Sequence, residues 1–138
     1  VLPYKFEAGT PNIAGVIGLS AAIDYINGID RAGALAHEQR LINYCIELAQ
    51  DIDDIKLYGT AKNKMAIFSF LLGDAHPSDV GTLLNQQGVA VRTGHHCTMP
   101  LMNELGIPGT VRASFSLYNT EEEVEMLFAA LTKVRTFL

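Results

Sequence analysis

The stretch TVRASFSLYNTEEE, residues 110–123, decides the fold class predicted for this chain. Its first eight residues, Thr110 to Leu117, alternate between apolar and polar side chains, as in a strand with one buried face. Thr120 and Glu123 then form a capping box, and a helix with an apolar stripe follows. A half-buried strand that leads directly into an amphipathic helix indicates that helices pack on one face of a sheet.

The chain upstream supplies the other elements of this layered fold. Two long helices, two strands and a short helix are expected at about residues 11–27, 31–51, 55–58, 65–72 and 77–87. The second strand is apolar almost throughout, which indicates a central strand or one covered on both faces. His76 before Pro77 marks the start of the short helix. We therefore predict an α+β fold with helices packed on a small, largely antiparallel sheet.

Length and composition restrict the class of protein. The 138 residues carry a formal net charge of −5 and are 49% hydrophobic, which suits one core. The acidic balance argues against a nucleic-acid partner, which would need a basic face. No apolar run approaches the ~20 residues of a membrane span, so no membrane partner and a cytoplasmic location are expected. We expect residues 1–28 to form a lead-in and linker helix, and residues 29–138 a small domain.

A second stretch, GVAVRTGHHCTMP at residues 88–100, carries the candidate chemistry. A short β-rich run, Val89 to Val91, leads into a loop with an arginine, two histidines and Cys97. The thiolate is the nucleophilic form of cysteine, and a nearby cation or base raises its fraction, so Cys97 is a candidate nucleophile. Cys45 lies on the apolar stripe of the second helix and is expected to be buried and inert. From these residues alone, a structural surface cysteine beside unrelated histidines stays open.

Zinc binding by His76, His95, His96 and Cys97 is an alternative of another class. The ligand types suit zinc, but no paired spacing of the structural kind occurs. Adjacent histidines would also have difficulty in sharing one tetrahedral ion. No metal is therefore expected.

Three stretches resemble the cysteine desulfurases that depend on pyridoxal 5'-phosphate, specifically the SufS-like group that includes selenocysteine lyases. They are Arg92–Met102, Phe6–Asn12, and Val111–Ser114 together with Tyr118–Thr120. Their order agrees with that family, and the similarity spans nearly the whole chain. The resemblance implies the C-terminal small domain of a class V aminotransferase of fold type I. Such enzymes are roughly three times as long, with a separate cofactor domain.

The resemblance also implies the roles of individual residues. Cys97 is expected to attack the substrate sulfur and to hold it as a persulfide. Arg112 is expected to bind the carboxylate of L-cysteine, assisted by Arg92, and His96 is expected to contact the substrate. Without the resemblance, two solvated arginines at a sheet edge would be the more ordinary interpretation.

Gly9 and Thr10 are the residues that match the cofactor-binding positions of the family. Thr10 is expected to reach the phosphate of pyridoxal 5'-phosphate in a partner subunit, which implies a homodimer. Local sequence alone favours another role, because Thr10 before Pro11 is typical of a helix N-cap.

The implied function is the conversion of L-cysteine to L-alanine, with the sulfur passed to an acceptor protein for iron–sulfur cluster assembly. The isolated chain is expected to be inactive, because the lysine that attaches the cofactor in the family has no match here. Selenocysteine lyase activity in the full-length protein stays open, and so does a non-catalytic thiol or protein-interaction module.

Overall fold

The computed structural model describes all residues 1–138 and divides the chain into two compact units, Val1–Ala32 and Gly33–Leu138. The first unit contains the short 3-10 helix η1 (Tyr4–Phe6) and helix α1 (Ile13–Asn27). The predicted domain boundary between residues 28 and 29 stays a prediction.

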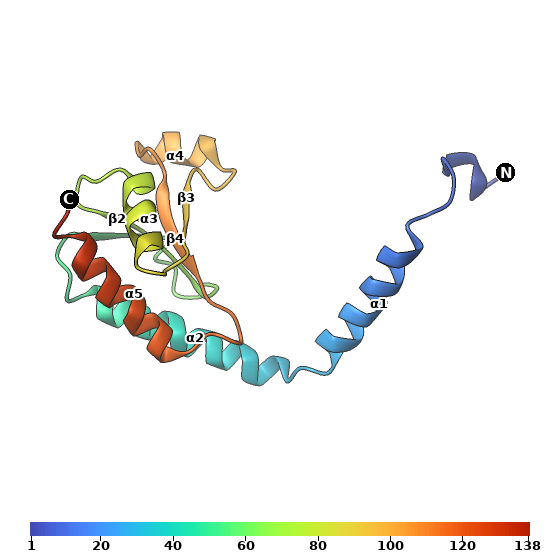
Figure 1. The fold of residues 1–138 in the computed structure, drawn as a ribbon, viewed down its shortest axis with the longest axis horizontal. Coiled ribbons are helices and arrows are strands. Elements are labelled where there is room, and N and C mark those ends of the chain that lie inside the picture. Colours follow the sequence, from blue (N-terminus) through green and yellow to red (C-terminus); the bar gives the residue numbers. More distant parts are fainter. The chain divides into compact units, whose positions relative to one another are not determined.

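The second unit carries the sheet and its covering helices (Figure 1). From α2 onward the elements are α2 (Arg31–Ala49), β1 (Ile55–Tyr58), β2 (Ile67–Leu72), α3 (Pro77–Gln86), β3 (Arg92–Gly94), α4 (Met99–Leu105), β4 (Thr110–Ser114) and α5 (Glu121–Val134). The strand order is β1-β2-β4-β3, and every neighbouring pair is antiparallel. This confirms the predicted α+β fold, and β2 is a central strand as its apolar sequence indicated.

One face of the sheet forms the core with three helices. Phe68, Phe70 and Val111 are fully buried on this face, and the ring centroids of the two phenylalanines lie 5.0 Å apart. Helices α2, α3 and α5 contribute further large buried side chains: Leu41, Ile42, Cys45, Val80, Leu84, Val124, Leu127, Phe128, Leu131 and Val134. Figure 1 shows α2 and α5 side by side, and a hydrogen bond of 2.8 Å from the Tyr44 hydroxyl to Glu125 joins them.

Two strand predictions need correction. β4 ends at Ser114 rather than Leu117, because the Asn119 side chain accepts a hydrogen bond from the Ser116 amide at 2.8 Å and forms a turn there. The strand before the cysteine loop is Arg92–Gly94 rather than Val89 to Val91. The amide of Val89 still donates to the Leu84 carbonyl at the end of α3. The start of this run is therefore bonded to the helix end, and pairing with β4 begins only at Arg92.

The N-terminus of α1 also differs from the prediction. Its N-cap is Asn12, whose side chain accepts a hydrogen bond from the Gly15 amide at 2.9 Å. Thr10 therefore does not cap the helix. No side chain of α1 is buried, including its apolar stripe of Ile13, Val16, Ile17, Ile23 and Ile26. No single helix of the chain is long and apolar enough to cross a membrane.

Two predicted helix starts are confirmed. The His76 side chain accepts from the Ser78 amide at 3.3 Å, with Pro77 in the first turn. At the start of α5, Thr120 accepts from the Glu123 amide at 3.3 Å, and the Glu123 carboxylate accepts from the Thr120 amide at 3.1 Å.

Removing this capping box should destabilise the second unit measurably. Thr120→Ala should lower the free energy of unfolding by about 1 kcal/mol, because the Glu123 amide loses its acceptor. Thr120→Ser keeps the hydroxyl and is the matched control. Urea unfolding of the chain, followed by circular dichroism, measures both variants, and equal midpoints for Ala and Ser would contradict the prediction.

Candidate functional site

The loop between β3 and α4 presents Cys97 on a strained turn. His96 and Cys97 both have positive φ angles, 55° and 66°, which is rare outside glycine. The Thr98 amide donates to the His95 carbonyl at 2.9 Å, and the Thr98 hydroxyl donates to the same oxygen at 2.7 Å. Helix α4 starts directly afterwards at Met99. The turn leaves the Cys97 side chain exposed to solvent.

Two glycines allow the ends of β3 and β4 to meet at the base of this loop. A Cβ atom on Gly109 would lie 2.7 Å from the carbonyl carbon of Gly94, closer than side chains tolerate. Both glycines also have positive φ angles, 105° for Gly94 and 140° for Gly109. The cysteine loop therefore starts from direct backbone contact between the two strands.

Two arginines lie opposite each other on the face of the sheet that α2, α3 and α5 leave uncovered. The register pairs Arg92 of β3 with Arg112 of β4, and Arg112 in turn with Ser69 of β2. Directly opposite residues point to the same face, and like charges in such a pair destabilise a sheet. An anion between the two guanidinium groups would relieve this repulsion.

Both guanidinium groups have donors suited to a ligand at this site. Arg92 donates from Nη2 to the Cys97 sulfur at 3.5 Å. Nε of Arg112 is buried and has no hydrogen-bond partner in the protein. The structure thus brings together Cys97, Arg92 and Arg112, three of the predicted site residues.

His96, the fourth of the predicted site residues, has its side chain directed to β4. Its Nε2 lies 2.9 Å from the Thr110 hydroxyl and 3.1 Å from the Thr110 carbonyl oxygen, whereas its Nδ1 is buried without a partner. Burial lowers the pKa of His96, and the charges of Arg112 and Arg92 lower it further, against the opposing effect of the bond to Thr110. The neutral ring is therefore the stable form at neutral pH.

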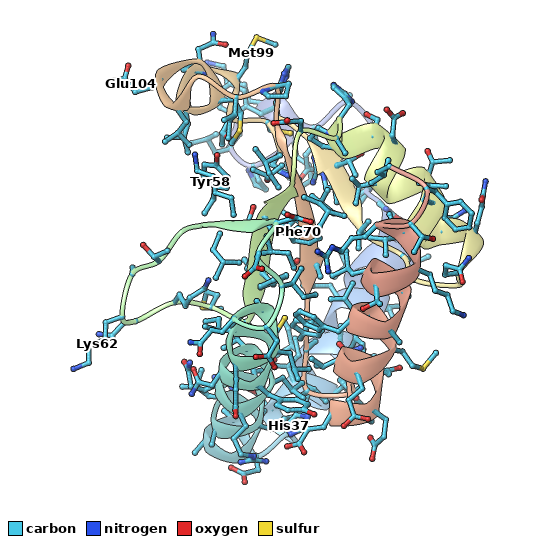
Figure 2. The ribbon with its side chains drawn as sticks, turned by 90° about the vertical axis from the view of Figure 1, so that its left-hand side faces the viewer. His37, Tyr58, Lys62, Phe70, Met99 and Glu104 are labelled. Atoms are coloured by element: carbon cyan, nitrogen blue, oxygen red, sulfur yellow. The ribbon has the colours of Figure 1, made fainter.

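Three further polar residues, Thr110, Ser69 and Tyr58, line one hollow together with His96 and were not predicted from sequence. Thr110 was expected on the solvent side of its strand, but it is only 1% exposed, and its hydroxyl lies 2.7 Å from that of Ser69. Ser69 interrupts the apolar run of β2, which is the signal that could have found it. The Tyr58 hydroxyl is buried without a partner, and Figure 2 shows Tyr58 beneath α4.

A mostly apolar hollow of about 540 Å³ lies beside these residues. Its polar lining residues are Tyr58, Lys64, Ser69, His96 and Thr110. Its apolar lining comes from the β1–β2 hairpin and α4: Met65, Ile67, Leu101, Met102 and Leu105.

The remaining candidate residues belong to other segments of the chain. Gly9 and Thr10 belong to the first unit. His76 caps α3. No group of three or more histidine, cysteine, aspartate or glutamate side chains is arranged to hold a metal ion.

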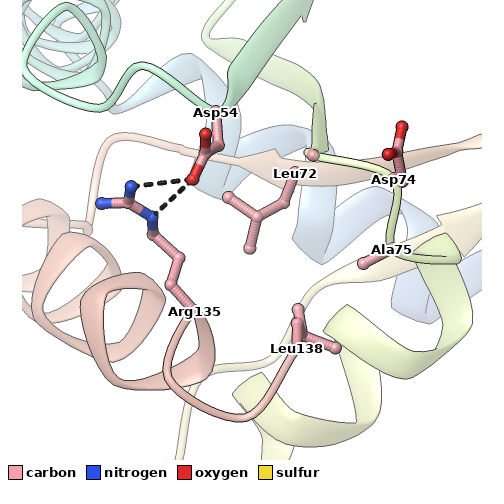
Figure 3. Close-up of a pocket in the computed structure, with 7 residues that line it drawn as sticks. Asp54, Leu72, Asp74, Ala75, Arg135 and Leu138 are labelled. Carbon is pink, nitrogen blue, oxygen red and sulfur yellow. Dashed lines mark hydrogen bonds and ion pairs between the residues drawn. The ribbon is translucent and has the colours of Figure 1, made fainter.

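A second hollow, of about 440 Å³, lies at the end of α5 (Figure 3). There Arg135 donates from Nη2 at 2.8 Å and from Nε at 3.2 Å to one oxygen of Asp54. Asp74 and Leu138 also line it, and none of the predicted site residues does. Arg135 is already paired with Asp54, whereas the cysteine site has an unpartnered donor in Arg112 Nε.

The two cysteines should differ sharply in reactivity. Cys45 is fully buried, and burial raises the pKa of its thiol, whereas Cys97 is exposed. Iodoacetamide under native conditions should therefore modify Cys97 first, as measured by mass spectrometry of the tryptic peptides. Cys97→Ser is the control that leaves only Cys45, which should react fully in urea. Equal native labelling of both cysteines would contradict the prediction.

Known proteins resemble this chain in sequence over nearly its whole length. A cysteine desulfurase of Salmonella agona is 49% identical over 138 residues, which cover 99% of this chain and 33% of that protein. A probable cysteine desulfurase of Streptomyces coelicolor is 49% identical over 137 residues, with coverages of 98% and 33%. The chain thus spans about a third of the length of these relatives.

Solved structures agree with this similarity. The apo cysteine desulfurase of Thermococcus onnurineus NA1 matches with a TM-score of 0.89 and 40% identity, over 99% of this chain and 34% of that one. The cysteine desulfurase CsdA of Escherichia coli, in an S-sulfonic acid form, matches with a TM-score of 0.89, 37% identity and the same coverages. Residues 1–127 match the aminotransferase class-V family. With most of its length matched in this way, the chain belongs to the aminotransferase class-V family.

Proposed function

We propose that the full-length protein is a cysteine desulfurase that depends on pyridoxal 5'-phosphate and that Cys97 is its nucleophile. The single observation that carries this proposal is the pairing of Arg92 with Arg112 beside the Cys97 sulfur. The cross-strand pair supplies positive charge for a carboxylate, and Cys97 supplies a nucleophile within reach of the same site. An amino acid that carries sulfur on its side chain matches both groups.

Substrate binding would use the guanidinium groups of the two arginines. The Nε of Arg112 is buried without a hydrogen-bond partner in the protein, and a carboxylate oxygen that reached it would supply one, so we take Arg112 as the main anchor. Arg92 already contacts the Cys97 sulfur, so it would connect the bound carboxylate with the nucleophile. Both ring nitrogens of His96 are turned to the protein interior, because Nε2 contacts Thr110 and Nδ1 is buried.

The sulfur transfer would take place at the exposed thiol. Cys97 loses its proton to solvent and attacks the substrate sulfur as a thiolate, forming a sulfur–sulfur bond while the carbon–sulfur bond of the substrate breaks. Bound pyridoxal 5'-phosphate supplies the electron sink that accepts the electrons of the broken bond. The former substrate carbon takes up a proton and leaves as L-alanine, and Cys97 retains the persulfide.

The residues of the first unit fit the phosphate of this cofactor. The Thr10 side chain is exposed and makes no hydrogen bond within the chain, and it lies two residues before the N-cap of α1. Gly9 has a φ angle of 152°, and a Cβ atom there would meet nothing within 4 Å, so its backbone is open to a ligand. We propose that Gly9 and Thr10 hold the phosphate, across a homodimer interface.

The exposed position of Cys97 also suits delivery of the sulfur to another protein. A persulfide must be reached by a second thiolate before it can be passed on. We propose an acceptor protein for iron–sulfur cluster assembly and a cytoplasmic location for this reaction.

Removal of the carboxylate anchor should weaken substrate binding. The test uses a full-length relative in which residues 1–138 replace the matching segment. Arg112→Ala should lose roughly 2–5 kcal/mol of interaction with L-cysteine, because one partner of a desolvated charge pair is removed. Arg112→Lys should recover only part, since an ammonium group lacks the two-pronged donor geometry. Cysteine-dependent alanine production and substrate titration measure both.

Lys133→Ala, an exposed substitution on α5, is the matched control and should behave as wild type. Wild-type affinity for cysteine in Arg112→Ala would show that the anchor lies elsewhere. No alanine production by the unsubstituted chimera would reject the desulfurase proposal itself.

The 138-residue chain alone should produce no alanine from cysteine when pyridoxal 5'-phosphate is added. None of its residues matches the family's cofactor-binding lysine, so the cofactor cannot be held covalently. Alanine is measured by chromatography, with a full-length relative as the positive control. Steady alanine release by the chain, at a rate above that of free cofactor with cysteine, would disprove this prediction.

A further inference from the structure

The turn that presents Cys97 depends on contacts outside the turn itself. His96 and Cys97 both adopt the left-handed conformation, which costs free energy that neighbouring contacts must offset. The side chain of Cys97 is exposed, so it provides little of this compensation. The side chain of His96 points the other way, to β4, and makes both of its hydrogen bonds there.

The hydrogen-bond geometry fixes the tautomer of His96. A backbone carbonyl oxygen only accepts hydrogen bonds, so the Nε2 that lies 3.1 Å from the Thr110 carbonyl must carry the proton. The same N–H also reaches the Thr110 hydroxyl at 2.9 Å, and that hydroxyl lies 2.7 Å from the Ser69 hydroxyl. A continuous chain of hydrogen bonds thus runs from β2 through β4 to the residue next to Cys97.

These hydrogen bonds pass through β4, the strand that carries the carboxylate anchor. Thr110 and Arg112 are two residues apart in β4, so their side chains share one face of the sheet. Fixing His96 to Thr110 therefore fixes the distance between the nucleophile and the group that would hold the substrate carboxylate.

We infer that His96 is a positioning residue, which acts with Thr110 and Ser69 to hold the Cys97 turn in place, and that it does not bind the substrate. The inference rests on the proposed function of Cys97 as the nucleophile. It gives His96 a different role from the substrate contact expected from sequence, and it assigns roles to Thr110 and Ser69.

Two amide substitutions separate the two possible uses of the histidine ring. The amide nitrogen of glutamine reaches about as far as Nε2, and that of asparagine about as far as Nδ1. His96→Gln should therefore keep the donor to Thr110 and preserve the turn. His96→Asn and His96→Ala should both lose this hydrogen bond. Thr110→Val should weaken it without abolishing it, because the Thr110 carbonyl acceptor remains.

Amide hydrogen exchange of the 138-residue chain, measured by NMR, reports the turn without any enzyme assay. The Thr98 amide, which donates to the His95 carbonyl, should exchange about tenfold faster in His96→Ala and His96→Asn, as expected from the loss of one hydrogen bond. It should exchange at the wild-type rate in His96→Gln. The Val124 amide in α5 is the control for global opening and should be unchanged in all variants.

A kinetic measurement in the full-length chimera tests the same inference at the site. His96→Ala should lower kcat at least tenfold and change the KM for cysteine less than twofold, because it displaces the nucleophile and not the carboxylate anchor. His96→Gln should restore most of kcat. Recovery by asparagine instead of glutamine, a raised KM with unchanged kcat, or an unchanged Thr98 exchange rate in His96→Ala would each overturn the inference.

The two proposals fail separately in these experiments. An inactive chimera with wild-type His96 would reject the desulfurase function, whereas the exchange measurement on the chain would still test the positioning role. Full activity of His96→Ala would reject the positioning role and leave the desulfurase function in place.

Discussion

The register of β4 between β2 and β3 is the constraint on which the rest of this protein depends. It places Val111 in the core against Phe70 and leaves Arg112 on the opposite face, opposite Arg92. A slip of one residue would exchange the two faces, because side chains alternate along a strand. A guanidinium group would then enter the core, and the pair of arginines would be lost. The packing of Phe68 and Phe70 therefore also enforces the geometry of the candidate site.

The site divides its parts between rigid and adaptable segments. The two arginines come from paired strands, whereas the nucleophile comes from a loop that begins at the contact between Gly94 and Gly109. Loops commonly carry reacting groups on a scaffold that positions them. Here the exposed loop gives Cys97 access to solvent, and the hydrogen bonds of His96 limit how far that loop can move.

Local sequence patterns predicted the parts of the fold that local interactions control. The capping box at Thr120 and the cap at His76 follow from residues within one turn of a helix. The apolar run of β2 gave its central position correctly. The exposed Cys97 and buried Cys45 likewise followed from their surroundings in the sequence.

Contacts between distant segments could not be predicted in this way. Ser69 and Thr110 are 41 residues apart, and only the antiparallel register brings their hydroxyl groups together. The predicted position of β3 was also wrong. Val89 to Val91 have strand-like side chains, but the Val89 amide remains hydrogen-bonded to the end of α3. The pairing of Arg92 with Arg112 depends on the register of β4 and on the position of β3. The two arginines were therefore predicted as site residues only through a family resemblance.

The facing arginines have a thermodynamic consequence for the fold as a whole. Without an anion between them, their mutual repulsion is part of the folding free energy of the sheet. Any carboxylate that binds there binds only the folded chain, and it stabilises that state by about 2.7 kcal/mol at a hundred times its dissociation constant. The melting temperature of the protein is therefore linked to the occupancy of its own site.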